Sequence, residues 1–150
     1  MEYHFFWGGP FSNWDDSPFR IDDTTYNCVE QYMMAMKAVT FNDVDSFAKI
    51  MMTHNPRKQK AIGRRVSGFD AGVWDALSFQ LVFYGCLKKF QQNQEHRLAL
   101  LDTDDKIIVE ASPYDRIWGI GFDASVALNH IDRWGENRLG KVLMEVRKVI

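Results

Sequence analysis

The sequence predicts an α+β fold, a single and mostly helical domain over residues 1–150 with a few short strands. The length is that of one ordinary domain. Apolar residues with helical spacing recur through most of the chain after residue 27. The few strand-like segments do not alternate with helices as βαβ units do. Because 46% of the residues are hydrophobic and 14% aromatic, the chain can bury a sizeable core.

The chain begins with strand and turn signals. Residues 3–7 are rich in aromatic side chains, and Gly8-Gly9-Pro10 ends that run. Residues 19–21 and 24–26 flank the pair Asp22-Asp23. Short apolar segments on either side of such a pair predict a β-hairpin.

Three helices are predicted next, each from a capping signal. A polar residue that can accept a hydrogen bond precedes each one, and an acid or a proline follows at a favourable position. The predicted starts are Asn27 with Glu30 for a helix to about residue 38, Asn42 with Asp45 for a helix to about residue 52, and Asn55 with Pro56.

Apolar periodicity predicts the rest of the fold. A longer helix is expected over residues 71–90, a short helix over 95–101, and a brief buried strand over 107–109. A last helix is expected from Asn137, with an apolar stripe on one face.

Composition excludes several classes of protein. No apolar run is long enough to span a bilayer, and the N-terminus lacks the basic and apolar order of a signal peptide. We therefore expect a cytoplasmic protein with no membrane partner. Cys28 and Cys86 have no metal-ligand spacing and are interpreted as small buried residues. The net charge of −2 excludes a broadly basic nucleic-acid coat but allows a local basic patch.

Glu30 and Lys37 are unusual because their predicted helix is apolar on most sides. Such a helix should be buried, and buried charges are costly unless they are paired or used. The two residues are almost two turns apart and share a face, about 10 Å apart along the axis. The structural alternatives are a capping role for Glu30 and a Lys37 side chain that extends to the surface.

The segment from Glu110 to Gly121 combines acids, aromatic residues and two glycines after the predicted strand. Loops at strand ends often hold ligands, and glycines let a ligand approach the backbone. Trp118 could stack on a base or a ribose, and Asp115 could take part in an ion pair or a proton transfer. The alternative is an ordinary turn in which Asp115 pairs with an arginine.

Two further segments could bind anions. Gly135 and Gly140 border polar residues that open the last helix, where free N–H groups suit phosphate, although Asn137 could be a plain N-cap. Residues 57–65 contain five cations in nine residues and no acid. This run is either a solvated face or a site for a pyrophosphate or a nucleic-acid backbone.

Taken together, these segments resemble the NADAR family, also called YbiA-like. The order and spacing match from about Phe5 to Arg147. The resemblance rests on Phe11-Ser12-Asn13-Trp14, Glu30-Gln31-Tyr32 with Lys37, Gly63-Arg64, Trp74, Asp115 with Trp118-Gly119, and Asn137 with Leu139-Gly140. It implies a YbiA-like α+β fold and N-glycosidase chemistry. The associated substrates are phosphoribosylamino-pyrimidine intermediates of riboflavin synthesis, or guanine bases that carry ADP-ribose.

The resemblance also implies roles for individual residues. Glu30, Lys37 and Asp115 would be catalytic. The substrate would be bound by Asn13, Arg64, Trp74, Trp118, Gly119 and Asn137. Glu30 and Asp115 would stabilise the charged ribose and protonate the leaving nitrogen. Lys37 would form a Schiff base with ribose C1′ or pair with an anionic group. The scheme requires no metal and no cofactor.

Two positions depart from the family pattern. Val29 stands before the glutamate, where a small residue is common. Glu136 precedes Asn137, where many members look basic or amide-bearing, and an acid there does not favour an anion.

We expect the chain to remove ADP-ribose from guanine in nucleic acid, because residues 57–65 could receive a nucleic-acid backbone and the chain has the character of a stand-alone domain. Cleavage of riboflavin-pathway intermediates is the first alternative. The others are a non-catalytic ADP-ribose-binding module and a helical interaction protein with structural charges. In the last case, Glu30→Gln would change only stability.

Overall fold

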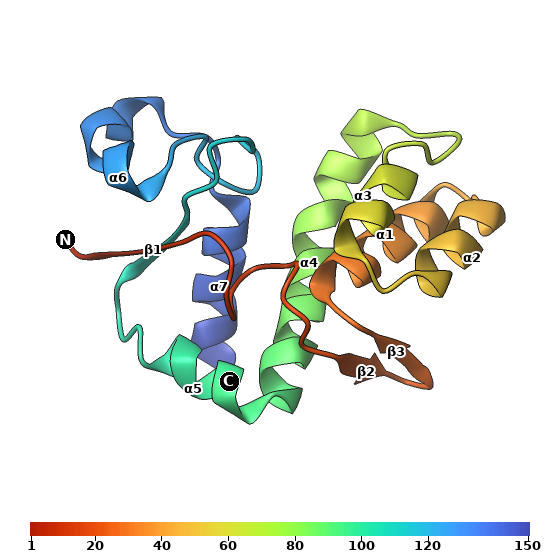
Figure 1. Cartoon of the computed structure of the whole chain (residues 1–150), viewed down its shortest axis with the longest axis horizontal. Helices are drawn as coiled ribbons and strands as arrows, with labels where there is room; N and C mark the ends of the chain where they lie inside the picture. The colour runs from red at the N-terminus through yellow and green to blue at the C-terminus, as the bar shows by residue number, and fades with distance from the viewer. The chain divides into compact units, whose positions relative to one another are not determined.

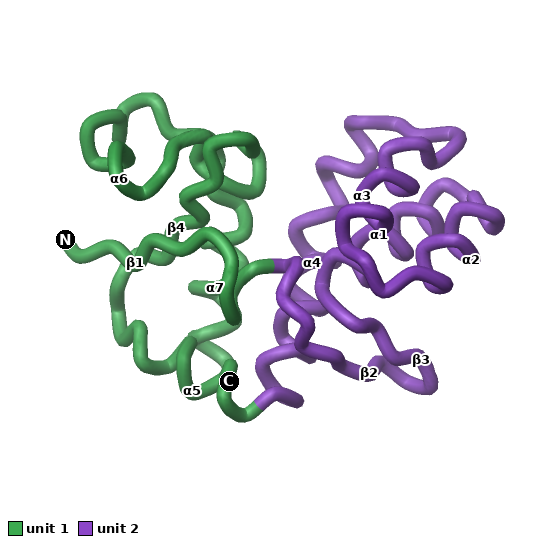
Figure 2. Tube along the Cα trace, in the orientation of Figure 1, with its two compact units in different colours: residues 1–12, 94–150 green, residues 13–93 purple.

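The computed structural model describes residues 1–150 and divides them into two compact units (Figure 2). Unit 1 contains residues 1–12 and 94–150, and unit 2 contains residues 13–93. Seven α-helices and four short strands confirm the predicted α+β class (Figure 1). The expectation of one domain over the whole chain stays a prediction.

Unit 2 is built around its first helix. Its elements are β2 (Phe19–Ile21), β3 (Thr24–Tyr26), α1 (Val29–Thr40), α2 (Val44–Met52), α3 (Pro56–Gly63) and α4 (Ala71–Gln92). Helix α1 packs against α2, α3 and α4. Residues 29–35 are all buried, as expected for a helix that is apolar on most sides.

The predicted helix starts in unit 2 are correct in one case and one residue early in two. Asn55 caps α3 by accepting hydrogen bonds from two backbone N–H groups, and Pro56 follows it. Cys28 occupies the N-cap position of α1 without a capping hydrogen bond, and the Asn27 side chain donates to the carbonyl of His54. Asp43 caps α2, and Asn42 before it has the left-handed φ of 57°.

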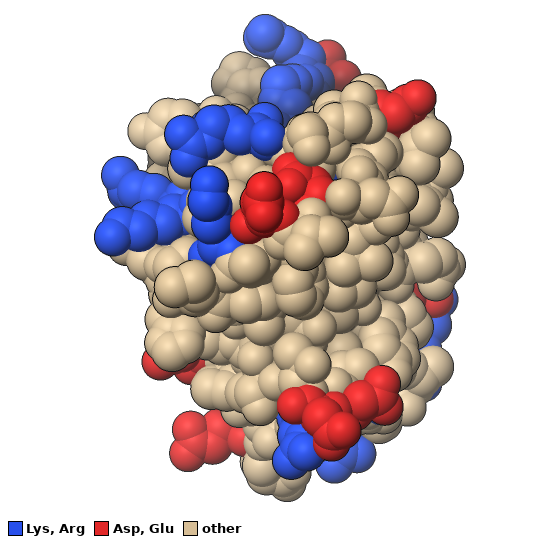
Figure 3. Space-filling view, turned by 90° about the vertical axis from the view of Figure 1, so that its right-hand side faces the viewer, with Lys and Arg blue, Asp and Glu red and all other residues tan.

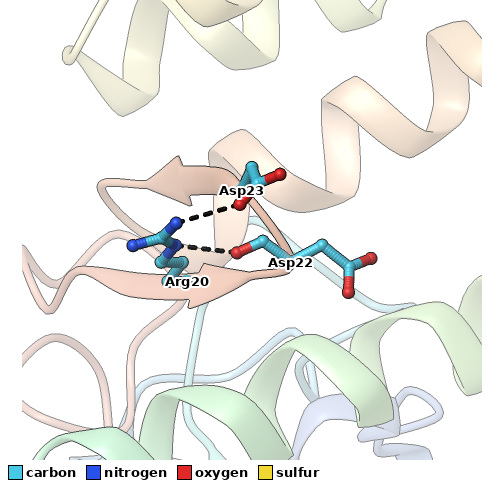
Figure 4. A network of polar contacts seen from close by, with 3 residues as sticks. All are labelled: Arg20, Asp22 and Asp23. Carbon is cyan, nitrogen blue, oxygen red and sulfur yellow. Dashed lines mark hydrogen bonds and ion pairs between the residues drawn. The ribbon is translucent and has the colours of Figure 1, made fainter.

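The predicted hairpin is confirmed. β2 and β3 pair antiparallel, with Phe19 opposite Tyr26, and these two rings stack with centroids 5.8 Å apart. At the turn, Arg20 donates to the carbonyl of Asp22 at 2.7 Å and to the carboxylate of Asp23 at 3.1 Å (Figure 4). The ion pair is exposed, so the apolar face, and not this charge pair, stabilises the hairpin.

Unit 1 consists of two parallel strands covered by the last helix. Its elements are β1 (Tyr3–Phe6), α5 (Gln94–Leu101), β4 (Ile107–Glu110), α6 (Ala124–Ala127), the 3₁₀ segment η1 (Leu128–Arg133) and α7 (Arg138–Val149). β1 pairs with β4 from Tyr3 opposite Ile107 onwards. Helix α7 packs on β4, and a Cβ atom at Gly140 would collide with the carbonyl of Ile108.

Several boundaries differ from the sequence predictions. Helix α4 extends two residues further, to Gln92, and β4 includes Glu110. The helical turns of α6 and η1 are absent from the sequence prediction, because α6 has only four residues and η1, which follows it directly, is interrupted by a non-helical His130. Such pieces are too short to give a periodic pattern. None of the helices has the length and apolar character needed to cross a bilayer.

Candidate active site

Glu30 lies in the first turn of α1, and one loop holds both ends of the residue. Its backbone N–H donates to the carbonyl of Asn13 at 3.0 Å. Its Oε1 accepts a hydrogen bond from Nε1 of Trp14, also at 3.0 Å. Only 7% of Glu30 is exposed. The contact with Trp14 gives this carboxylate a role beyond helix capping.

Lys37 lies two turns further along α1 and is half-buried. Burial lowers the pKa of the Lys37 amine below its usual value; the Glu30 carboxylate opposes this shift and the Arg64 guanidinium adds to it. The Nζ atom lies 4.5 Å from the ring centroid of Phe69. The structure therefore brings Glu30, Lys37 and Arg64 into one electrostatic group, and their catalytic and binding roles stay predictions.

Asn13 and Trp74 are the other predicted site residues in unit 2. Asn13 is buried, its carbonyl holds the Glu30 N–H, and its Oδ1 accepts a weak hydrogen bond from Cys86 Sγ at 3.9 Å. Trp74 is half-buried in the first turn of α4. Asn13 thus supports Glu30 directly. The substrate-binding roles of Asn13 and Trp74 stay predictions.

Asp115 and Trp118 belong to the loop after β4 in unit 1. The Asp115 carboxylate accepts hydrogen bonds from the backbone N–H groups of Ile117 and Trp118, at 2.8 and 2.9 Å. The guanidinium of Arg138 lies 5.0 Å from the Trp118 ring centroid. Asp115 therefore shapes its own loop through Oδ1. Its catalytic role and the stacking role of Trp118 stay predictions.

The start of α7 differs from the prediction of free N–H groups that could bind phosphate. Three of these groups donate to the carbonyls of the preceding loop, at 3.1 to 3.2 Å. The donors are Asn137, Arg138 and Leu139, and the acceptors are Gly119, Ile117 and Trp118. The loop folds over the helix end, so its carbonyls take the place that the sequence analysis assigned to an anion.

The side chain of Asn137 also forms hydrogen bonds through both its oxygen and its nitrogen. Its Oδ1 accepts from the N–H of Glu110 at 3.0 Å, and its Nδ2 donates to the carbonyl of Ile108 at 2.9 Å. Asn137 has φ of 52° and caps α7 by position, but not through its side chain. Gly119 is needed for the close approach of Glu110, since a Cβ atom there would lie 2.9 Å from the Glu110 carbonyl. Both residues dock α7 and its loop on β4, and their substrate-binding roles stay predictions.

The sequence and structure of the chain were compared with those of known proteins. The NADAR domain matches residues 5–150. This chain belongs to the NADAR family. It is 48% identical to N-glycosidase R617 of Acanthamoeba polyphaga mimivirus, over 82% of this chain and 74% of that protein. It is 34% identical to N-glycosidase Npun_R5314 of Nostoc punctiforme, over 95% of this chain and 85% of that protein.

A solved structure supports the same assignment. The NMR structure of the Escherichia coli protein YbiA is similar to the NADAR domain described here, with a TM-score of 0.81 and 29% identity, over 98% of this chain and 83% of that one. The predicted family and YbiA-like fold are therefore confirmed. Relatives of this NADAR domain are named N-glycosidases, so it belongs among enzymes that hydrolyse N-glycosyl bonds.

Within this NADAR domain, the contact made by Trp14 cannot be predicted from the sequence, where the residue is only one part of the motif Phe11-Ser12-Asn13-Trp14. In the structure it donates to the carboxylate predicted to be catalytic. The available signal was a tryptophan inside this motif, because an indole N–H can only donate a hydrogen bond. Two surface hollows, one at the α1–α2 junction and one on α5, include neither Glu30 nor Lys37.

Proposed function

We propose that this chain removes ADP-ribose from ADP-ribosylated guanine in nucleic acid by hydrolysing the bond between ribose C1′ and the guanine nitrogen. The observation that carries the proposal is the group formed by Glu30, Lys37 and Arg64 in unit 2, next to the cationic helix α3. It provides a carboxylate, an amine with a lowered pKa and a guanidinium, and each suits a different part of such a substrate.

Glu30 is suited to stabilise the positive charge that develops on the ribose during bond cleavage. As the base departs, positive charge builds on C1′ and on the ring oxygen of the ribose. A carboxylate that is held in place lowers the energy of this state most effectively where little water competes. Glu30 meets both conditions, since it is 7% exposed and is bonded to Trp14.

Lys37 suits a covalent route. A ribose attached to an exocyclic amine can open to an imine, and a neutral lysine amine can add to C1′. The lysine nitrogen then gives up a proton, which Glu30 can pass to the guanine amine. The protonated amine leaves. A Schiff base remains on Lys37, and water hydrolyses it to the free sugar and the free lysine. The lowered pKa of Lys37 favours this step, because it increases the neutral fraction of the amine.

Helix α3 favours nucleic acid over a small phosphoribosylated intermediate. The run of cations on α3 and just after it comprises Arg57, Lys58, Lys60, Arg64 and Arg65. Lys and Arg side chains gather along one side of the face drawn in Figure 3. This cationic run is continuous with the proposed site, because Lys60 Nζ lies 6.0 Å from the Trp14 ring centroid and Arg64 acts on Lys37. Phosphate backbones bind such surfaces by releasing counterions.

The test is a parallel assay of two substrates. DNA with ADP-ribosylated guanine and a phosphoribosylamino-pyrimidine are each incubated with wild type, Glu30→Gln and the exposed control Glu95→Gln, and products are identified by mass spectrometry. We expect ADP-ribose from the first substrate with wild type and with the control. For Glu30→Gln we expect a rate lower by roughly 10²- to 10⁴-fold.

Other outcomes would contradict the proposal. Release of ribose 5-phosphate from the second substrate alone would assign the chain to riboflavin intermediates. If neither substrate were cleaved while ADP-ribose still bound, the chain would be a recognition module. Thermal melting of each variant separates loss of chemistry from loss of fold.

A further inference from the structure

We propose that Trp14 is a positioning residue that fixes the Glu30 carboxylate for reaction through its indole N–H. The inference rests on the proposed function of Glu30, and it assigns a task to a residue outside the predicted catalytic and binding set. Trp14 acts through Glu30 and transfers no proton itself.

The indole Nε1 lies 3.0 Å from Oε1 of Glu30, and the neighbouring Asn13 holds the Glu30 backbone N–H at the same distance. Adjacent residues of one loop therefore bind both the main chain and the carboxylate of Glu30. A glutamate side chain has three rotatable bonds, and fixing both ends restricts the orientations of the carboxylate.

The loop around Trp14 is held to helices α1 and α4 through Asn13 and is closed after Trp14 by a local turn. Asn13 is 8% exposed and contacts Cys86 of α4 through its side chain. After Trp14, the backbone N–H and the hydroxyl of Ser17 both donate to the carbonyl of Asp15, at 2.9 and 3.1 Å. Because the loop backbone is held at Asn13, the indole of Trp14 is kept close to the Glu30 carboxylate.

An indole N–H can only donate a hydrogen bond, whereas water or a hydroxyl group can donate or accept. A donor-only partner favours the ionised carboxylate, which is the form needed opposite a positively charged ribose. Lys60 Nζ lies 6.0 Å from the ring centroid, so a cation also lies near this side of the loop.

A different role for Trp14 makes a different prediction. The residue is 39% exposed, so its ring could serve only as a wall on which a base stacks. A stacking wall depends on the face of the ring and not on its N–H group. The substitution Trp14→Phe separates the two roles, because it keeps an aromatic face and removes the donor.

The kinetic experiment compares wild type, Trp14→Phe and the control Trp7→Phe, an exposed tryptophan in unit 1. We expect Trp14→Phe to lower kcat roughly 10- to 100-fold with little change in KM, as for a lost hydrogen bond to a charged group. The acid limb of its pH–rate profile should move to higher pH, because a carboxylate that loses a donor is protonated more easily. Trp7→Phe should match wild type. A rise in KM alone, or an unchanged kcat and pH profile, would overturn the proposal.

A second measurement does not depend on activity. In ¹⁵N-tryptophan-labelled protein, the Trp14 indole N–H resonance, assigned by its loss in Trp14→Phe, should titrate with pH in wild type and stop titrating in Glu30→Gln. If the resonance does not respond to Glu30→Gln, the Trp14 proposal is wrong even if the enzyme is active. If it responds while wild type cleaves neither substrate, the positioning contact stands and the proposed function fails.

Discussion

At the scale of single residues, Lys37 shows how burial can prepare an ordinary side chain for chemistry. The amine is half-buried on α1 with Arg64 close enough to disfavour its charged form. Both effects lower the pKa of the amine, so its neutral and nucleophilic fraction at neutral pH is increased. The carboxylate of Glu30 acts in the opposite direction and keeps the pair electrostatically coupled.

This coupling leads to a prediction about trapping. Borohydride added during turnover should reduce a Schiff base and link the sugar to Lys37, and the yield should rise with pH through the lowered pKa of Lys37. Peptide mass spectrometry should find the adduct on Lys37 in wild type and in the exposed control Lys49→Arg, and no adduct at this position in Lys37→Arg. Active enzyme that gives no adduct would leave Lys37 as a partner of an anionic group.

The residues of the candidate site were predictable to different degrees. Glu30 and Lys37 could be paired from sequence, because seven residues in a helix return to the same face. The contact between Trp14 and Glu30 could not, because the two residues are 16 positions apart and the β2–β3 hairpin lies between them. Nothing in the local pattern specifies the direction in which a loop side chain points.

At the scale of elements, α2 shows how one cap can join two segments. Asp43 accepts from the N–H and the hydroxyl of Ser46 at 3.1 and 2.6 Å, and from the N–H of Ser67 at 2.9 Å. The hydroxyl of Ser46, followed by the backbone N–H groups of Ser67 and Ser46, lowers the pKa of Asp43 to about 2. The ionised carboxylate therefore anchors the loop after α3 to the start of α2.

Asp43 should make the stability of the protein depend on pH. Since its pKa is lower in the folded chain than in the unfolded chain, its contribution is complete above about pH 4 and is lost as pH falls towards 2. Asp43→Asn should lower the free energy of unfolding clearly at pH 6 and less at pH 3, measured by urea denaturation. Asp45→Asn, an exposed control in the same turn, should show a smaller difference. An equal loss at both pH values for Asp43→Asn would contradict this account.

The start of α7 in unit 1 shows which features of helix capping the sequence does not specify. Asn137 was expected to open the last helix and does so, but its side chain bonds β4 instead of capping α7. The N–H groups of the helix start are satisfied by the loop before it. A sequence pattern indicates that these groups need acceptors, and only the folded chain shows which acceptors they have.

At the scale of the whole molecule, a local cationic surface exists on a chain whose net charge is −2. Exposed Arg57, Lys58 and Arg65 all come from α3 or the residues after it. If these cations contact a phosphate backbone, binding of nucleic acid should weaken steeply as salt increases.

The salt dependence gives a test of this surface. The double variant Arg57→Gln with Lys58→Gln should bind an oligonucleotide more weakly than wild type, and the slope of log affinity against log salt should fall by about one for each lost contact. Fluorescence anisotropy at several salt concentrations measures both quantities. The exposed control Lys148→Gln on α7 should behave as wild type. An unchanged slope in the double variant would exclude α3 as the backbone contact.

The sequence by itself determined the α+β class, the hairpin, the main helices, the NADAR family and the shared face of Glu30 and Lys37. These features depend on residues close together in the chain, or on a pattern of residue types that sequence displays directly. Only the tertiary structure decided the parallel pairing of β1 with β4, the occupied start of α7 and the hydrogen bond from Trp14 to Glu30. The physical reason is that local sequence specifies which groups must be buried or hydrogen-bonded, while the partner that satisfies each group comes from a distant segment and is selected only when the whole chain packs.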